Sequence, residues 1–232
     1  MFNRYLYTFI EQGSEEWLKL HDPTNKIITA SIVPDIVGVG YQSRNKIYRQ
    51  FKGLEKREFN EQTQQILSYG RVNEHNAAEQ FKEILNLPQA KMGFIFHPYY
   101  DWLGCSPDRI LRASDGEYEL LEIKCPFKAK IPESITEIPL KYIIQCQIQL
   151  ACLPSVRGCY LYIWRHLHHK NLFYLEPDLE LQEYLIDCCK LFLEKVNSNE
   201  DINFSYLRVQ QKERDKLISL INYSKIHCYF FD

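Results

Sequence analysis

The chain has 232 residues, of which 45% are hydrophobic and 14% aromatic, enough apolar side chains to bury the core of one sizeable domain. Charged residues make up 25% and the formal net charge is −2, which excludes a disordered or collagen-like chain. The same balance excludes recognition of nucleic acid through overall basicity, so any DNA-binding surface has to be local.

The eight cysteines contain no pair with the two-residue spacing typical of zinc or iron–sulfur sites, which favours free, reduced thiols. They are Cys105, Cys125, Cys146, Cys152, Cys159, Cys188, Cys189 and Cys228. No apolar run approaches the roughly 20 residues of a membrane span, and the first residues do not form a secretory signal. We therefore expect a soluble, intracellular protein that is not secreted and does not bind membranes, in the host cytoplasm or nucleus if it is viral.

Two short helices are predicted in the first 40 residues. Ser14 precedes two glutamates, and this order is typical of a helix start because the serine oxygen accepts from free N–H groups and acids favour the positive helix end. In the second helix, the Ser31 side chain can cap the N-terminus, Pro34 is tolerated in the first turn and Gly38 can end the helix.

Residues 41–60 form the clearest basic stretch, with six cations and two acids. One interpretation is an arm that contacts backbone phosphates, with aromatic residues between the cations. The other is a solvated helical face, and the pattern favours neither. The cations are Arg44, Lys46, Arg49, Lys52, Lys56 and Arg57.

From residue 69 to residue 87 apolar residues recur every three or four positions, which predicts a helix with one buried stripe. Glu74 lies on that stripe. A buried carboxylate is costly unless it is paired or bound to a metal, so Glu74 is a candidate ligand. The alternative is a first-turn residue near solvent.

An antiparallel meander is predicted next, with strands at 93–97, 102–111 and 118–124 and a turn at 114–116. A helix follows from about residue 138 to residue 153, and Gln147 interrupts its apolar stripe. Further strands are predicted at 156–164 and 172–176, and the remainder is mostly helical. The cluster of His166, His168 and His169 favours a polar turn over a metal site.

The meander carries the most informative pattern, P-D, thirteen residues, then E-x-K. Adjacent strands bring Asp108 and Glu122 to the separation at which two carboxylates share a hard cation. Lys124 lies two residues after Glu122 and thus on the same face of the strand, while Ile123 points into the core and offers its carbonyl.

These residue types suit phosphodiester hydrolysis. Two acids can hold Mg²⁺ and leave positions for water and phosphate, and the metal then activates water and stabilises the added negative charge. Lys124 would orient the attacking water or neutralise the transition state. Alone the pattern is weak, because E-x-K on a strand is often a solvent-facing charge ladder.

Within the predicted order of helices and strands, the pattern is more specific. The chain resembles the lambda-exonuclease and YqaJ-type viral recombinase family of PD-(D/E)xK nucleases, which includes viral alkaline nucleases. The resemblance implies an α/β fold with a restriction-endonuclease-like αβββαβ core, a central mixed sheet flanked by helices and extra N- and C-terminal helices. It implies a single nuclease domain over 1–232, with its core at about 10–176 and a helical extension at about 178–232. The motifs that carry it are QGSEEWLKL (12–20), ITAS (28–31), YGRVNEHNA (69–77), GCSPD (104–108), LEIKCPF (121–127) and QCQIQL (145–150).

Carried over by position, the resemblance implies that Asp108 and Glu122 are metal ligands and Lys124 is the catalytic lysine. Glu74 becomes an outer metal or water ligand, and the carbonyl of Ile123 an additional one. Gln147 is expected to contact the substrate or the lysine, with Gln145 as a weaker candidate.

The resemblance also implies a group of residues around a terminal 5′-phosphate. Ser31 and Ser106, with a cation near Lys130, match these family positions. His21 stands where the family usually carries an arginine, which weakens the expectation of a phosphate anchor, although Lys26 could substitute.

The implied function is a deoxyribonuclease that uses Mg²⁺ or Mn²⁺, with two ions, as a 5′-to-3′ exonuclease on linear duplex DNA in viral-type recombination or genome processing. Expected partners are duplex ends or single-stranded DNA, a homo-oligomer in the form of a ring trimer, and a single-strand annealing protein. Two alternatives stay open: an endonuclease or DNA/RNA alkaline nuclease of the same fold, and a non-catalytic nucleic-acid-binding or assembly protein.

Overall fold

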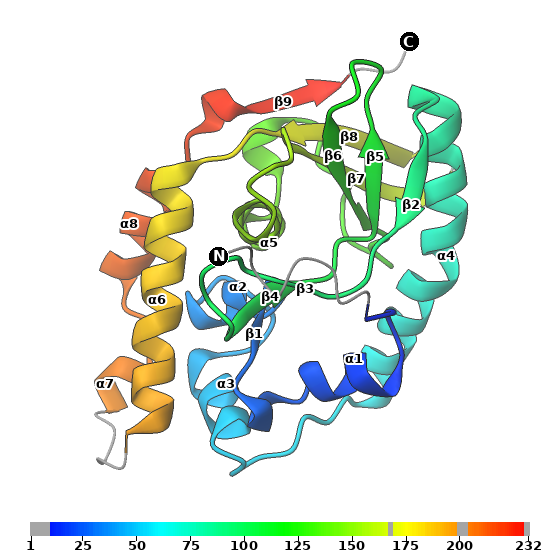
Figure 1. The fold of residues 1–232 in the computed structure, drawn as a ribbon. Helices are drawn as coiled ribbons and strands as arrows, with labels where there is room; N and C mark the ends of the chain where they lie inside the picture. Colours follow the sequence, from blue (N-terminus) through cyan, green and yellow to red (C-terminus); the bar gives the residue numbers. More distant parts are fainter. Residues whose placement is uncertain (1–9, 167–168, 199–203, 230–232) are drawn as a thin grey trace, which may run out of the picture.

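The structure of the chain is a computed structural model, which describes residues 10–166, 169–198 and 204–229 (Figure 1). The helices are α1 (Glu15–Leu20), η1 (Pro23–Asn25), α2 (Val33–Ile36), α3 (Arg44–Phe51), α4 (Glu61–Leu85), η2 (Ile135–Glu137), α5 (Leu140–Cys152), α6 (Leu179–Asn197), α7 (Phe204–Leu207), α8 (Gln211–Leu220) and η3 (Tyr223–Lys225). The strands are β1 (Ile28–Thr29), β2 (Gln89–Lys91), β3 (Ile95–Phe96), β4 (Leu103–Cys105), β5 (Arg109–Arg112), β6 (Tyr118–Lys124), β7 (Cys159–His166), β8 (His169–Leu175) and β9 (Ile226–Tyr229).

A six-stranded mixed sheet forms the centre of the molecule, with the strand order β2-β5-β6-β7-β8-β9. Strands β5 and β6 are antiparallel, whereas β6 and β7 are parallel because α5 crosses over between them. A small sheet of order β1-β4-β3 lies beside it. The succession α4, β2, β5, β6, α5, β7 is that of a restriction-endonuclease-like core, so the predicted fold class is confirmed.

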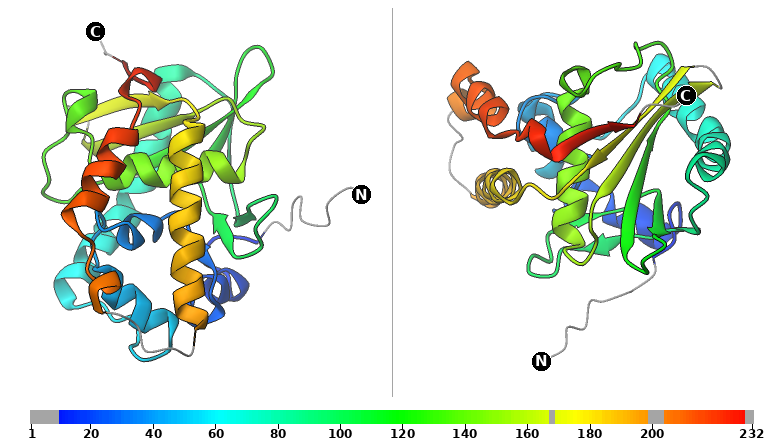
Figure 2. Two further views of the ribbon diagram at one scale, coloured as in Figure 1. Left: turned by 90° about the vertical axis from the view of Figure 1, so that its left-hand side faces the viewer. Right: turned by 90° about the horizontal axis from the view of Figure 1, so that it is seen from above.

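Helices cover both faces of the large sheet (Figure 2). On one face α4 packs Ala77, Ala78 and Phe81 against alternate residues of β6, namely Leu121 and Ile123. On the other face α5 and α6 pack against the remaining strand residues in the larger core cluster. Because successive side chains of a strand point to opposite faces, Glu122 belongs to the α5 face.

The predicted strand 102–111 is wrong in one respect, because it is divided between the two sheets. Strand β4 pairs with β1 and β3, whereas β5 pairs with β2 and β6. Pro107 lies at the break, has no N–H to donate to a ladder, and its carbonyl accepts from Gln12 Nε2 at 3.1 Å. Asp108 therefore stands immediately before β5, where the chain enters the large sheet.

The C-terminal segment also differs from the expected helical extension, because it ends in a strand. After α6, α7 and α8, strand β9 adds to the edge of the large sheet, antiparallel to β8. Its alternation is only four residues long, with Ile226 buried and His227 exposed, too short to identify from sequence. His166 and His169 flank the β7–β8 turn, and His168 lies outside the described residues.

The first predicted helix begins as expected. The Ser14 hydroxyl accepts from the backbone N–H of Trp17 at 3.2 Å, and the two glutamates occupy the first turn of α1. None of the helices in the described ranges combines the length and the apolar character needed to cross a bilayer.

Two glycines in contrasting positions test how closely the small sheet is packed. A Cβ on Gly104 would lie 2.4 Å from Phe94 Cζ and 2.7 Å from the Ile95 carbonyl oxygen, whereas a Cβ on Gly70 in α4 would meet nothing within 4 Å. We expect Gly104→Ala to lower the free energy of unfolding by about 1–3 kcal/mol through overpacking. Gly70→Ala should raise it by up to about 1 kcal/mol through helix propensity. Urea unfolding of both variants checks this, and a neutral Gly104→Ala would contradict the packing.

Candidate active site

Two carboxylates face each other across β5 and β6. Arg109 pairs with Leu121 in the antiparallel register, so one residue further out Asp108 lies opposite Glu122. Asp108 Oδ2 accepts a hydrogen bond of 2.7 Å from the Ile123 backbone N–H. The hairpin therefore brings the two acids together.

Glu122 is a buried carboxylate, 2% exposed, that is held by three donors. Its Oε1 accepts from Lys124 Nζ at 2.5 Å and from Gln145 Nε2 at 2.6 Å. Its Oε2 accepts from Gln149 Nε2 at 2.6 Å. Such charge-assisted bonds compensate the cost of burying the carboxylate.

Lys124 is bound on two sides. Besides Glu122, its ammonium donates to Gln145 Oε1 at 2.9 Å. Burial disfavours the charged form of Lys124, but the negative charges of Glu122 and Asp108 outweigh it and raise the pKa of the ammonium. Lys124 is accordingly a fixed cation beside the acid pair.

The acid pair itself carries excess negative charge. Burial raises the pKa of Asp108 well above its usual range, and the charges of Glu122 and Glu74 add to this shift. The neighbouring Cys125 thiol has its pKa raised to about 12 by burial and by Asp108, so it stays protonated at neutral pH and packs rather than attacks.

Glu74 lies near the acid pair but is bound elsewhere. Its Oε1 accepts from Arg109 Nη1 at 3.1 Å, and the same nitrogen donates to the Asp108 carbonyl. The Glu74 side chain is 33% exposed. Arg109 thus neutralises the predicted outer ligand.

Gln147 does not face this site, which corrects the expectation from the sequence. Its Nε2 donates to the Glu176 carbonyl at 2.8 Å, and its Oε1 accepts from the Asp178 N–H and Gln182 Nε2, each at 2.9 Å. Gln147 therefore ties α5 to the start of α6. Two residues along a helix is about half a turn, so Gln145 and Gln149 lie on the opposite side.

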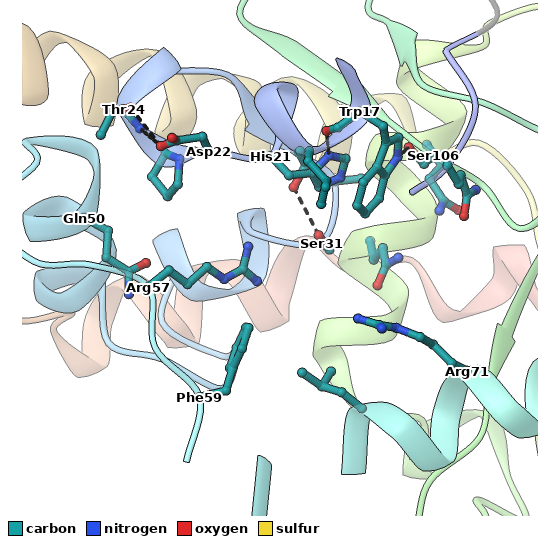
Figure 3. A pocket seen from close by; sticks show the side chains of 18 of the residues that line it. Trp17, His21, Asp22, Thr24, Ser31, Gln50, Arg57, Phe59, Arg71 and Ser106 are labelled. Atoms are coloured by element: carbon teal, nitrogen blue, oxygen red, sulfur yellow. Dashed lines mark hydrogen bonds between the residues drawn. The ribbon is translucent and has the colours of Figure 1, made fainter. Parts of the chain in front are cut away.

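A cavity of about 920 Å³ opens over the acid pair and is lined by Asp108, Glu122, Lys124, Gln145 and Gln149. Figure 3 shows Arg57 and Arg71 reaching into this space from opposite walls, below Ser31. Arg57 precedes α4, and Arg71 projects from it. The cavity therefore carries cations, Lys56, Arg57 and Arg71, as well as the acid pair.

Ser31, Ser106 and His21 line the same cavity, and their contact with a phosphate stays a prediction. Ser106 Oγ accepts from Trp17 Nε1 at 2.9 Å, and the Trp17 and His21 rings stack at 3.5 Å between centroids. Burial lowers the pKa of His21, which makes it a poor cation at neutral pH. The Ser31 hydroxyl lies 3.1 Å from Thr29 Oγ1 and does not cap α2, contrary to expectation.

Lys26 and Lys130 do not reach the cavity, which corrects two further expectations. Lys26 Nζ donates to Asn197 Oδ1 at 2.6 Å on the α6 side. Lys130 is 66% exposed and pairs with Glu133 and Glu137. Both lie on loops, whose course the sequence pattern does not define.

The basic stretch 41–60 is divided among several roles. Arg44 is buried and bound to Glu213, and Lys52 donates to the Ser198 carbonyl. Lys46 and Arg49 both pair with Glu55, leaving Lys56 and Arg57 to line the cavity. The stretch is neither a continuous phosphate-binding arm nor a simple solvated face.

The site residues predicted from the sequence omit Gln149 and Arg71, which line the cavity, and Arg57 was named only as one cation of the basic stretch. Gln149 was detectable, because it lies four residues after Gln145 and thus on the same helix face. The arginines come from a loop and from α4, so only the fold brings them near Ser31. The buried Gln149 Oε1 has no hydrogen-bond partner in the described part of the chain.

The donor set fits a magnesium ion. No group of three or more His, Cys, Asp or Glu side chains that could hold a metal occurs in the described ranges. Mg²⁺, however, usually takes one or two carboxylates and keeps several waters. Asp108 and Glu122 both line the cavity, and their mutual repulsion is what a divalent cation relieves. Whether the Ile123 carbonyl is a ligand stays a prediction.

Fold and site together define a restriction-endonuclease-like protein of the PD-(D/E)xK type. Residues 16–154, more than half of the chain, match the YqaJ-like viral recombinase domain, and the chain belongs to that family. The resemblance drawn from the sequence motifs is thereby confirmed.

Solved structures share the fold. An alkaline exonuclease (LHK-Exo) from Laribacter hongkongensis has a TM-score of 0.60 and 21% identity, covering 88% of this chain and 100% of its own. LHK-Exo in complex with dAMP has a TM-score of 0.59, 21% identity and the same coverage. No curated protein matches the sequence.

The two glutamine positions on α5 give a stability test of the site geometry. Gln147→Ala removes the partner of the Glu176 carbonyl, the Asp178 N–H and the Gln182 amide, so we expect a loss of about 1–3 kcal/mol in the free energy of unfolding. Gln145→Ala should cost less, because Gln145 borders the open cavity and water can replace its amide. Urea unfolding without metal checks this. Equal losses would contradict the assignment of Gln147 to the fold and Gln145 to the cavity.

Proposed function

We propose that this protein is a metal-dependent exodeoxyribonuclease that hydrolyses duplex DNA from its ends. The observation that carries the proposal is the arrangement of Asp108, Glu122 and Lys124 on one wall of a cavity whose other walls carry Arg57 and Arg71. Membership of the YqaJ-like family and the fold shared with an alkaline exonuclease support it.

Asp108 and Glu122 would hold the divalent ion, which supplies an activated water and charge stabilisation at the scissile phosphate when bound. Lys124 has three N–H donors, of which Glu122 and Gln145 occupy two among the described residues. The third is available to a water or a phosphate oxygen. Gln145 and Gln149 keep the Glu122 carboxylate oriented toward the cavity.

The residues present support one ion more directly than two. A second ion would need Glu74, and Arg109 already neutralises that carboxylate at 3.1 Å. We propose that Asp108 and Glu122 would together hold a single Mg²⁺ or Mn²⁺.

We further propose that Arg57 and Arg71, with Ser31 and Ser106, bind a terminal 5′-phosphate and so set a 5′-to-3′ polarity. Two guanidinium groups and two hydroxyls offer the donors that a phosphate accepts. They replace Lys26 and Lys130, which lie outside the cavity. A ring trimer, a single-strand annealing partner and an intracellular location stay predictions of the family resemblance.

The catalytic assignment is tested with matched variants. We expect Lys124→Ala and Asp108→Asn to lower the rate of linear duplex degradation with Mg²⁺ by roughly 10²–10³-fold or more, since each removes charge that acts on the reacting phosphate. Lys130→Ala and Asp115→Asn change the same residue types outside the cavity and should leave the rate unchanged. Wild-type rates in both site variants would remove the mechanism, and cleavage of closed circular DNA would indicate an endonuclease.

Polarity is tested by comparing duplexes with 5′-phosphate and 5′-hydroxyl ends. We expect the native protein to prefer the phosphorylated end, and Arg57→Ala and Arg71→Ala to reduce this preference roughly tenfold each, because each removes a charge-assisted hydrogen bond. Lys26→Ala is the control and should keep the preference. A preference that both arginine variants retain would show that the 5′-phosphate binds elsewhere.

A further inference from the structure

A second cavity, of about 1090 Å³, lies away from the candidate active site, between the loop that joins α2 to α3 and the segment around the start of α8. The two walls touch at a glycine, since a Cβ on Gly38 would lie only 2.6 Å from Val209 Cγ2. Figure 2 shows α8 beside the N-terminal helices on this side of the molecule. We call this cavity the α8 groove, lined among others by Tyr41, Gln42, Arg44, Arg208, Gln211 and Arg214.

The α8 groove contains three arginines, and two of them form no ion pair with the rest of the described chain. Arg44 is 5% exposed and is occupied by the Ile36 and Tyr206 carbonyls and by Glu213, so it holds the walls together. Arg208 and Arg214 are exposed, and neither forms an ion pair within the described ranges. None of the described residues that line the groove is acidic. An anionic ligand is therefore the expected occupant.

An exposed aromatic ring lies at the groove. Tyr41 is 80% exposed and its ring centroid is 3.6 Å from Lys141 Nζ. A tyrosine held in this way keeps its ring in place at the surface, ready to stack against a flat partner.

Cations and rings then alternate from Tyr41 to the candidate active site. Lys141 Nζ lies 5.4 Å from the Tyr142 ring centroid, and Lys124 Nζ lies 5.5 Å from the same centroid. Tyr142 is buried, and both ammonium groups lie near its ring. The α8 groove and the acid pair are thus joined by one continuous series of contacts.

We propose that the α8 groove binds single-stranded DNA, with Arg208, Arg214 and Lys141 on the phosphates and a base stacked on Tyr41. Cations that follow a backbone, together with an exposed ring, are the elements of sequence-independent single-strand binding. A single strand is required because the faces of a base inside a duplex are covered by the neighbouring base pairs and cannot stack on the ring. That the nucleic acid is DNA rests on the proposed function, whereas the binding itself needs no hydrolysis.

The test is the affinity of the full chain for a fluorescent 12-nucleotide oligothymidylate with a 5′-hydroxyl end, measured by anisotropy in EDTA. We expect Tyr41→Ala to weaken binding roughly tenfold through loss of stacking. The double variant Arg208→Glu/Arg214→Glu should weaken it further and reduce the slope of log K against log salt by roughly 1.4, or about 0.7 for each phosphate contact.

Matched controls make the result specific to the groove. Tyr99 is 83% exposed and Arg112 is exposed on β5, both outside the groove, so Tyr99→Ala and Arg112→Glu should bind the oligonucleotide as the native protein does. Groove variants that bind like these controls would overturn the proposal. So would an equal loss of affinity for a 12-base-pair duplex, because that result would indicate general charge attraction.

Failure of this proposal is distinguishable from failure of the proposed function. A native protein that degrades no DNA, yet binds the oligonucleotide through the groove, contradicts the nuclease alone. A protein that degrades duplex DNA while its groove variants bind the 12-mer normally contradicts the groove alone.

Discussion

The burial of the Glu122 carboxylate is the interaction on which the rest of this site depends. A charge that is 2% exposed is tolerated only with donors on both oxygens, and Lys124, Gln145 and Gln149 supply them. These donors come from the same strand and from one face of α5, so the helix has to cross the sheet at this point. The crossover that makes β6 and β7 parallel is what places α5 there.

The part of the site that could be predicted is the part that strand geometry determines. The closeness of Asp108, Glu122 and Lys124 follows from the hairpin between their strands and from the two-residue repeat of side-chain direction along a strand. Both features are visible in the sequence. The choice of a site residue on α5 was less certain, because Gln145, Gln147 and Gln149 are spaced two residues apart and fall on more than one face of the helix. Selecting Gln147 placed the substrate contact half a turn away from the face that α5 presents to Glu122.

What could not be predicted depends on long-range packing. Arg57 follows a loop and Arg71 projects from the exposed side of α4, and no local pattern relates either residue to Ser31. The break between β4 and β5 is an intermediate case, since Pro107 marks it in the sequence but only the fold shows that the two halves join different sheets. Conversely, Lys26 and Lys130 were plausible by position but find partners on other surfaces.

The same polar arrangement costs stability in the absence of a cation. Asp108, Glu122 and Glu74 place three acids against two cations, Lys124 and Arg109, and the pKa of Asp108 is raised first by burial and further by the charges of Glu122 and Glu74. The buried Gln149 oxygen adds an unpaired acceptor beside the same carboxylate. Purely structural packing would have replaced such groups with apolar ones at little cost. Their combination at the wall of an open cavity is therefore best explained by a ligand that carries positive charge and donates to oxygen, as a hydrated divalent ion does.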